Sequence, residues 1–432
     1  RATLDGALAA LKSAGRGAQG LGGGSAAPRS MAAASHDADL ALISVPGEHA
    51  FAEAMDAVDS GLSVMLFSDN VGVAQEVALK AAAEQRDVLV MGPDCGTAVV
   101  SGVALGFANK VRLGPVGIVA ASGTGAQQVM CLLDTAGVGM SHCLGVGGRD
   151  MSTAVGGRST RQALRALDGD PNTEAVVIVS KPAAPEVLTE IEQLVAGLSK
   201  PVYWATLGVG RPDLTAGVER ALEGLGYAVP QWPMWPADPA AASSSCAASA
   251  SAAAQEDDGE RYLRGIFVGG TLADEAMIVA GERLGDIRSN IPLRPDLALP
   301  AGMASEGHTV IDMGDDEMTR GRPHPMIDPS LRLSRIEHEA ADPSCGVLLL
   351  DLVLGYGSHP DPAGELAEAI RAARARAGAD GRELPVVVGL VGVENDPQGL
   401  TRCAALLSAA GADVYLSNAA ATRRAVDLLV AS

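Results

Sequence analysis

The sequence predicts an α/β protein with a Rossmann-like first part followed by flavodoxin-like parts. Short β-branched runs alternate with Ala- and Leu-rich helical stretches, which is typical of repeated βα units and parallel sheets. With 47% hydrophobic and 19% charged residues, the 432-residue chain can bury a substantial core. This length suggests two to four domains.

The first series of elements lies between residues 40 and 92 and forms a Rossmann-like half. Residues 16–35, which are low in complexity, are expected to form a flexible loop before it. The predicted strands are Leu40–Val45, Ser63–Ser68 and Val88–Gly92, and the predicted helices are Ala50–Ser60 and Val71–Glu84.

A second series has the size of a flavodoxin-like domain. Its predicted strands are Gly117–Ala121, Met140–Val146, Ala175–Val179 and Pro201–Leu207, and its predicted helices are Ala126–Thr135, Thr160–Leu167 and Glu186–Leu198. A Pro-, Ser- and Ala-rich stretch follows, which predicts a mobile linker.

The third series begins after this linker and includes a long stretch expected to be irregular. Its predicted strands are Arg264–Val268, Val347–Leu352, Pro385–Leu390 and Asp413–Leu416, and its predicted helices are Leu272–Arg283, Gln398–Ala410 and Ala419–Val430. The expected division is therefore 1–112, 113–229, a linker at 230–262, and 263–432.

Composition excludes several classes of protein. The net charge of −20 argues against a nucleic-acid binder and against an anionic membrane surface. The six cysteines lie far apart without a CxxC motif, which argues against a disulfide framework and structural zinc. No apolar run reaches the ~18–20 residues of a membrane helix, so we expect a cytoplasmic protein. Because the sequence starts at Arg1 without a signal-peptide pattern, we expect it to begin inside a longer reading frame.

A predicted strand-to-helix junction carries two hydroxyls and two glycines, at Ser122, Gly123, Thr124 and Gly125. The start of a helix presents unpaired N–H groups and the positive end of the helix dipole, so this junction could hold a phosphate. It is not a Walker A loop, because no Gly-Lys-Ser/Thr follows. Ordinary N-capping by Ser or Thr remains the alternative.

A second glycine pair, Gly147 and Gly148, follows the next predicted strand and precedes Arg149. Ligands of open α/β sheets bind at this edge. The glycines would allow close backbone approach, and Arg149 could hold an anion. A plain turn is the alternative.

The densest polar segment is 307–332, and three prolines stiffen it. A long ordered loop of this kind tends to be functional. Its acidic residues Asp315, Asp316 and Glu317 could bind Mg²⁺, but a solvated acidic loop is the commoner explanation. We therefore predict no metal.

The same segment supplies candidate catalytic residues. His308 and His324 could act as general acid–base groups. Arg322 and Arg332 could clamp a carboxylate or phosphate through paired donors. The alternative is that these side chains pair with Asp312, Asp315, Asp316 or Asp328 and only brace the domain.

Seven short motifs are spread along almost the whole chain. They are Met91–Thr97, Gly106–Asn109, Ala121–Gly125, Gly147–Asp150, Gly269–Leu272, Gly307–Asp316 and Arg322–Arg332. Together they resemble the α subunit of succinyl-CoA synthetase and, more closely, the FdrA family of acyl-CoA-synthetase-like proteins. The resemblance implies a Rossmann-like CoA-binding-type domain and two flavodoxin-like ligase-type domains.

The departures from that family pattern concern the phosphohistidine. Ligases of this class carry it in a Gly-His-Ala-Gly-like loop after the strand predicted here to end at Leu207, but residues 206–213 contain no histidine. The glutamate expected after the preceding strand is replaced by Ser180-Lys181-Pro182. No ATP-grasp domain is recognisable either.

Members of the FdrA family are linked to oxamate carbamoyltransferase. The resemblance therefore implies carbamoyl phosphate or phosphate as substrate, two other subunits as partners, an oligomer, and a role in allantoin or purine catabolism. No cofactor is certain, although CoA could bind. Two alternatives remain: a subunit of a true acyl-CoA synthetase, such as a succinate–CoA ligase, and a non-catalytic CoA- or nucleotide-binding regulatory subunit.

Overall fold

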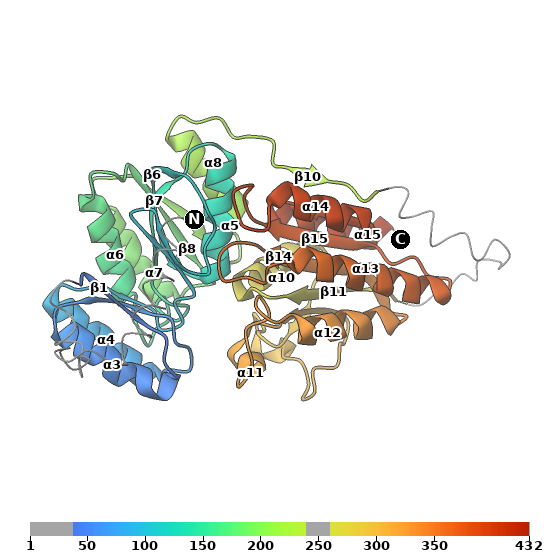
Figure 1. The fold of residues 1–432 in the computed structure, drawn as a ribbon, viewed down its shortest axis with the longest axis horizontal. Coiled ribbons are helices and arrows are strands. Elements are labelled where there is room, and N and C mark those ends of the chain that lie inside the picture. The colour runs from blue at the N-terminus through green and yellow to red at the C-terminus, as the bar shows by residue number, and fades with distance from the viewer. Residues whose placement is uncertain (1–37, 239–259, 432) are drawn as a thin grey trace, which may run out of the picture.

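The computed structural model describes residues 38–238 and 260–431, and it confirms the predicted α/β class. Three β-sheets follow one another along the chain, each flanked by helices (Figure 1). The predicted loop at 16–35 and most of the predicted linker lie outside the described residues.

The first sheet has three parallel strands in the order β1-β2-β3. Its elements are β1 (Leu40–Ile43), α3 (Gly47–Asp59), β2 (Ser63–Leu66), α4 (Val73–Arg86) and β3 (Val90–Met91). Helix α3 buries Ala50, Ala54, Ala57 and Val58, whose spacing puts them on one helical face.

The second sheet has six strands in the order β5-β4-β7-β6-β8-β9. The hairpin β4–β5 precedes the predicted division at residue 113, yet β4 pairs antiparallel with β7 of this sheet. The elements are β4 (Thr97–Val100), β5 (Val103–Gly106), β6 (Leu113–Ala121), α5 (Gly123–Thr135), β7 (Met140–Gly145), α6 (Arg158–Gly169), β8 (Ala175–Ser180), α7 (Pro185–Val195), β9 (Val202–Thr206) and α8 (Leu214–Gly224).

The third sheet has seven strands in the order β10-β16-β15-β14-β11-β13-β12. Only β10 (Met234–Trp235), which lies inside the predicted linker, runs antiparallel to its neighbour. The first elements after it are β11 (Tyr262–Phe267), α10 (Gly270–Leu284), β12 (Ile287–Ser289), η2 (Pro295–Leu297) and β13 (His308–Asp312). The remaining ones are α11 (Asp316–Thr319), α12 (Ser330–Ala341), β14 (Cys345–Val353), α13 (Pro362–Ala379), β15 (Val386–Val391), α14 (Leu400–Ala409), β16 (Ala412–Tyr415) and α15 (Asn418–Ala431).

The region between α10 and β14 corrects the sequence-based expectation of an irregular stretch. It contains β12, β13 and α12, so segment 307–332 is a strand, a short helix, a loop and the first turn of a helix rather than one long loop. The reason is that the buried part of β13, Thr309–Asp312, contains only two apolar residues, Val310 and Ile311. A run this short gives little periodicity.

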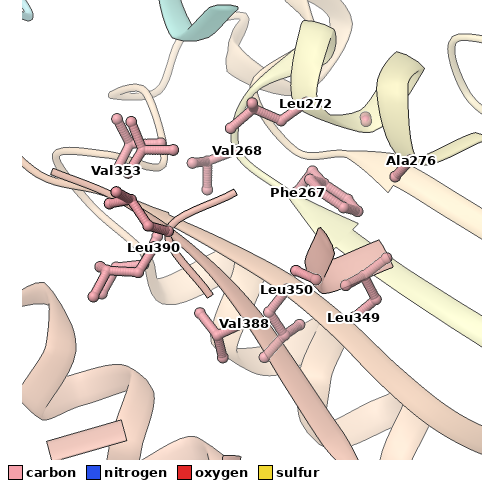
Figure 2. Packing of buried hydrophobic residues seen from close by; sticks show 14 of the residues in the cluster. Phe267, Val268, Leu272, Ala276, Leu349, Leu350, Val353, Val388 and Leu390 are labelled. Carbon is pink, nitrogen blue, oxygen red and sulfur yellow. The ribbon is translucent and has the colours of Figure 1, made fainter. Parts of the chain in front are cut away.

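The core of the third sheet is built mainly from the apolar residues of its central strands. β14 is buried along all nine residues and β15 along all six, as expected for parallel strands covered on both faces. Figure 2 shows Phe267 of β11 close to Leu349 and Leu350 of β14 and to the start of α10. Burial of one such aromatic ring stabilises the fold by about 1.5–3 kcal/mol.

Candidate active site

The carboxyl ends of strands from all three sheets border one cavity of about 720 Å³. The first sheet contributes Asp69 and Asp94, which follow β2 and β3. The second contributes the start of α5 and, after β8, Lys181; the third contributes the start of α10 and Asp312 at the end of β13. Ligands of parallel α/β sheets bind at this edge, so the cavity is the candidate active site.

Helix α5 begins inside the predicted phosphate motif. Ser122 is the N-cap, and its Oγ accepts a hydrogen bond of 2.9 Å from the N–H of Gly125. The capping interpretation is therefore confirmed, and it removes Gly125 from any anion site. Gly123 and Thr124 line the cavity, and their N–H groups belong to the helix start that has no intrahelical partner. Capping and anion binding are thus compatible at this junction.

The start of α10 lies against the start of α5, at the junction of the second and third sheets (Figure 1). A Cβ on Gly269 would lie 2.5 Å from Thr124 Oγ1, so only glycine allows this approach. Gly269, Gly270 and Thr271 line the cavity, and no side chain caps α10. Two helix N-termini therefore point their positive dipole ends into one space, which favours an anion there.

Arg149 lines the same cavity, and two hydrogen bonds to neighbouring residues hold its side chain in place. Its Nε donates to Glu76 Oε2 at 3.0 Å and its Nη2 donates to the Val71 carbonyl at 2.8 Å. Gly148 also lines the cavity, whereas Gly147 is buried in the turn with φ +89°. A Cβ on Gly147 would lie 2.5 Å from the Pro93 carbonyl oxygen. Gly147 therefore shapes the loop, while Gly148 and Arg149 face the ligand space.

Of the two predicted catalytic histidines, only His324 lines the cavity. Its Nδ1 accepts the N–H of Met326 at 3.2 Å. Burial lowers the pKa of His324 to about 4, with the Asp69 charge opposing the shift. The ring is therefore neutral at pH 7, with its proton on Nε2. His324 is suited to donate a hydrogen bond to a developing negative charge rather than to act as an imidazolium acid.

Arg322 borders the cavity from an exposed position. Its backbone N–H donates to the Thr319 carbonyl at 2.9 Å. Within the described part of the chain, its guanidinium has no hydrogen bond or ion pair. It is available to a ligand entering the site.

The structure does not bring His308 or Arg332 to this cavity. His308 begins β13, at the opposite end from Asp312, where its Nδ1 accepts the N–H of Leu263 at 3.1 Å. Arg332 is 3% exposed and donates through Nη2 to Asp351 Oδ1 and the Ile266 carbonyl, both at 3.0 Å. Arg332 therefore braces the domain, but its partner is Asp351 rather than one of the four expected aspartates, and its charge joins β11 to β14.

Residues that the sequence interpretation did not assign to the site also bring charge to the cavity. Lys181 lines it, and although burial works against the charged form, the carboxylates of Asp274 and Asp312 raise its pKa. Burial raises the pKa of Asp312 to about 7. The side chain of Asp94 is exposed to the cavity, yet desolvation inside the cavity, assisted by the charge of Asp316, raises its pKa to about 7. Two carboxyl groups that exchange protons near neutral pH thus line the cavity.

Within residues 38–238 and 260–431, no group of three or more His, Cys, Asp and Glu side chains is arranged to hold a metal ion. No helix in these ranges is long and apolar enough to span a membrane.

Comparisons with known proteins identify relatives. Residues 266–428 match the family described as CoA-ligase. The chain is 41% identical to YahF of Escherichia coli (strain K12) over 379 residues, which cover 87% of this chain and 74% of YahF. It is 28% identical over 180 residues to subunit alpha 2 of the ADP-forming succinate–CoA ligase of Archaeoglobus fulgidus, covering 41% of this chain and 61% of that subunit.

Among solved structures, the chain is similar to acetyl-coenzyme A synthetase 1 of Ca. Korarchaeum cryptofilum, determined with phosphate and ADP. The identity is 18%, the TM-score is 0.36, and the match covers 96% of this chain and 86% of that one. A second similar structure is the ATP citrate lyase of Methanothrix soehngenii, at 15% identity and a TM-score of 0.36, covering 72% of this chain and 55% of the lyase.

Proposed function

This chain belongs to the family of E. coli YahF and contains a CoA-ligase domain, and from that premise we propose that it is an FdrA-like subunit of a carbamoyltransferase. Its substrate would be carbamoyl phosphate or inorganic phosphate. It would act in the cytoplasm with two other subunits, in a reaction of the oxamate carbamoyltransferase type.

The observation that carries this proposal is a cavity that two helix N-termini border and that holds no usable phosphohistidine within the described residues. The N-termini of α5 and α10 meet in a cavity whose only histidine, within the described residues, is His324. Because His324 Nδ1 accepts the Met326 N–H, its Nε2 carries the proton and has no lone pair for attack on phosphorus. The loop after β9, Leu207–Asp213, contains no histidine either. These features favour direct attack by phosphate over a phosphoenzyme.

The steps of this reaction can be assigned to residues that line the cavity. Inorganic phosphate, held by the N–H groups of Gly123 and Thr124, attacks the carbamoyl carbon of an N-carbamoyl amide. The C–N bond breaks, the amide nitrogen takes up a proton, and carbamoyl phosphate and the free amide leave. The Nε2–H of His324 would stabilise the oxyanion. Asp94 or Asp312, with pKa values of about 7, would carry the proton from phosphate to nitrogen.

The CoA-ligase match favours a second candidate, a subunit of an acyl-CoA synthetase. In that case CoA would bind, and a partner subunit would have to supply the phosphohistidine. The third candidate, a regulatory subunit, would bind a ligand without turning it over.

One assay separates the three candidates. The chain is incubated, alone and with the products of neighbouring genes, with carbamoyl phosphate and oxamate, and phosphate release is followed. Parallel reactions contain acetyl phosphate or succinate with ATP, Mg²⁺ and CoA. We expect oxamate-dependent phosphate release. Formation of an acyl-CoA without it would support the ligase, and no turnover in either reaction would support the regulatory role.

A further inference from the structure

Lys181 is the first residue after β8, and its ammonium lies at the start of α10. A Cβ on Gly270 would lie 2.6 Å from Lys181 Nζ and 2.7 Å from Asp312 Oδ2. Both charged groups therefore border the space that the missing side chain of Gly270 leaves open. Among the described residues, Lys181 makes no hydrogen bond and no close ion pair.

This placement is unfavourable unless a ligand completes it. A cation beside the N-terminus of a helix is repelled by the helix dipole, since this end favours negative charge. A partly buried ammonium without a hydrogen-bond acceptor also has a cost of desolvation. The nearby carboxylates of Asp274 and Asp312 offset part of this cost without contacting the ammonium. An anion between Lys181 and the two helix starts would satisfy all three donors together.

We propose that Lys181 is a fixed positive charge that contacts the phosphoryl group of the substrate between the N-termini of α5 and α10. The inference rests on the proposed function for the identity of the anion as phosphate or an acyl phosphate. Lys181 takes no covalent part, because the surrounding carboxylates keep the amine protonated and a protonated amine is no nucleophile. It stands at the position where the resemblance leads us to expect a glutamate, so the sign of the charge at this point is reversed.

The test measures anion binding, which requires neither the partner subunits nor turnover. Sulfate and inorganic phosphate are titrated by calorimetry into the wild-type chain and into Lys181→Met and Lys181→Arg. We expect Lys181→Met to weaken both anions by about tenfold or more, because a charge-assisted hydrogen bond is lost. Lys181→Arg should retain most of the affinity. Circular dichroism verifies that each variant is folded.

Lys200→Met is the matched control. Lys200 precedes β9 at the opposite edge of the same sheet, where its Nζ donates to the Leu167 carbonyl at 2.7 Å. The substitution removes the same charge without touching the cavity, so we expect wild-type affinity for sulfate.

The anion titration tests the role of Lys181 independently of the carbamoyl-transfer assay. Equal sulfate affinity in the wild type and Lys181→Met would overturn the inference, as would equal weakening by Lys200→Met or no binding to the wild type. A carbamoyl adduct on the Lys181 peptide after exposure to carbamoyl phosphate, absent from other lysine peptides, would overturn the fixed-charge role. If Lys181→Met alone loses sulfate while transfer fails, the anion site stands and the proposed reaction falls.

Discussion

Two lysines near the cavity have opposite surroundings. Lys80 of α4 is fully buried and bonds to Glu76 at 2.8 Å, Asp150 at 2.7 Å and the Val146 carbonyl at 2.9 Å. Lys181 lines the cavity and has no such partner in the described residues. A buried ammonium with three acceptors holds the structure together. An ammonium placed among charges but bonded to none is available for a ligand.

The network around Lys80 also supports the site indirectly. Glu76 accepts from both Lys80 and Arg149, and Asp150 accepts from Lys80 and from the N–H groups of Ser159 and Thr160. The loop that presents Arg149 is therefore fixed before a ligand arrives. Such a rigid support reduces the cost of ordering the site on binding.

The largest expected effect is the loss of stability in Lys80→Met. Removal of this ammonium leaves Glu76 and Asp150 buried without their counter-charge, which costs about 3–5 kcal/mol. Urea unfolding followed by circular dichroism measures the change in the free energy of unfolding. A loss below about 1 kcal/mol would mean that Lys80 is not the structural member of the pair.

Arg322→Lys is expected to reduce transfer activity by about tenfold or more, since about 1.4 kcal/mol of lost transition-state binding has that effect. Lysine retains the charge but not the paired donors of the guanidinium. The melting temperature should hardly change, because Arg322 is exposed and unpaired in the described part of the chain. Arg332→Lys is the contrasting variant, and its effect should be on stability, because Arg332 braces β11 and β14. If Arg322→Lys instead retained full activity and had a lowered melting temperature, Arg322 would have a structural role like that of Arg332.

Sulfate affinity should increase as the pH falls from 8 to 6, by roughly tenfold for one proton taken up. Desolvation raises the pKa values of Asp94 and Asp312 to about 7, and a bound anion raises them further. Binding therefore takes up protons and is favoured at low pH. Sulfate is the suitable probe because its own charge does not change in this range. The slope should decrease in Asp94→Asn, and an affinity that falls toward pH 6 would refute the assignment.

The smallest expected effect is that of Lys181→Met on stability. Because Lys181 has no hydrogen-bond partner in the described residues and faces a helix N-terminus, its removal should change the free energy of unfolding by less than about 1 kcal/mol. The measurement is the same urea titration as for Lys80→Met. A loss of about 3 kcal/mol or more would show that Lys181 has a structural role like that of Lys80.

Sequence reasoning located the site where local rules apply and missed it where they do not. Ser122 to Thr124 was predictable because a hydroxyl and glycines directly follow a strand. Lys181 also directly follows a strand, so the same positional rule could have found it. Asp69 and Asp94 also follow predicted strands, but their place in the same cavity as Lys181 depends on the docking of the first sheet onto the others, which no local rule predicts.

In the fold, too, local patterns predict some features, whereas others depend on contacts between distant residues. The three series of strands and helices follow from alternating composition, and the sheets confirm them. The position of Arg332 depends instead on Asp351, nineteen residues away along the chain, which accepts its charge inside the core. No pattern in the sequence distinguishes this buried arginine from the exposed Arg322.

We propose that this family member handles a phosphoryl anion without a phosphoenzyme. The direct measurement uses carbamoyl phosphate labelled in its phosphoryl group, supplied with oxamate to the chain and its neighbouring gene products, and quenched in base to preserve phosphohistidine. We predict oxamate-dependent release of labelled inorganic phosphate and no label on the protein. Label bound to a histidine of this chain, removed on addition of succinate and CoA, would contradict the account and indicate a ligase.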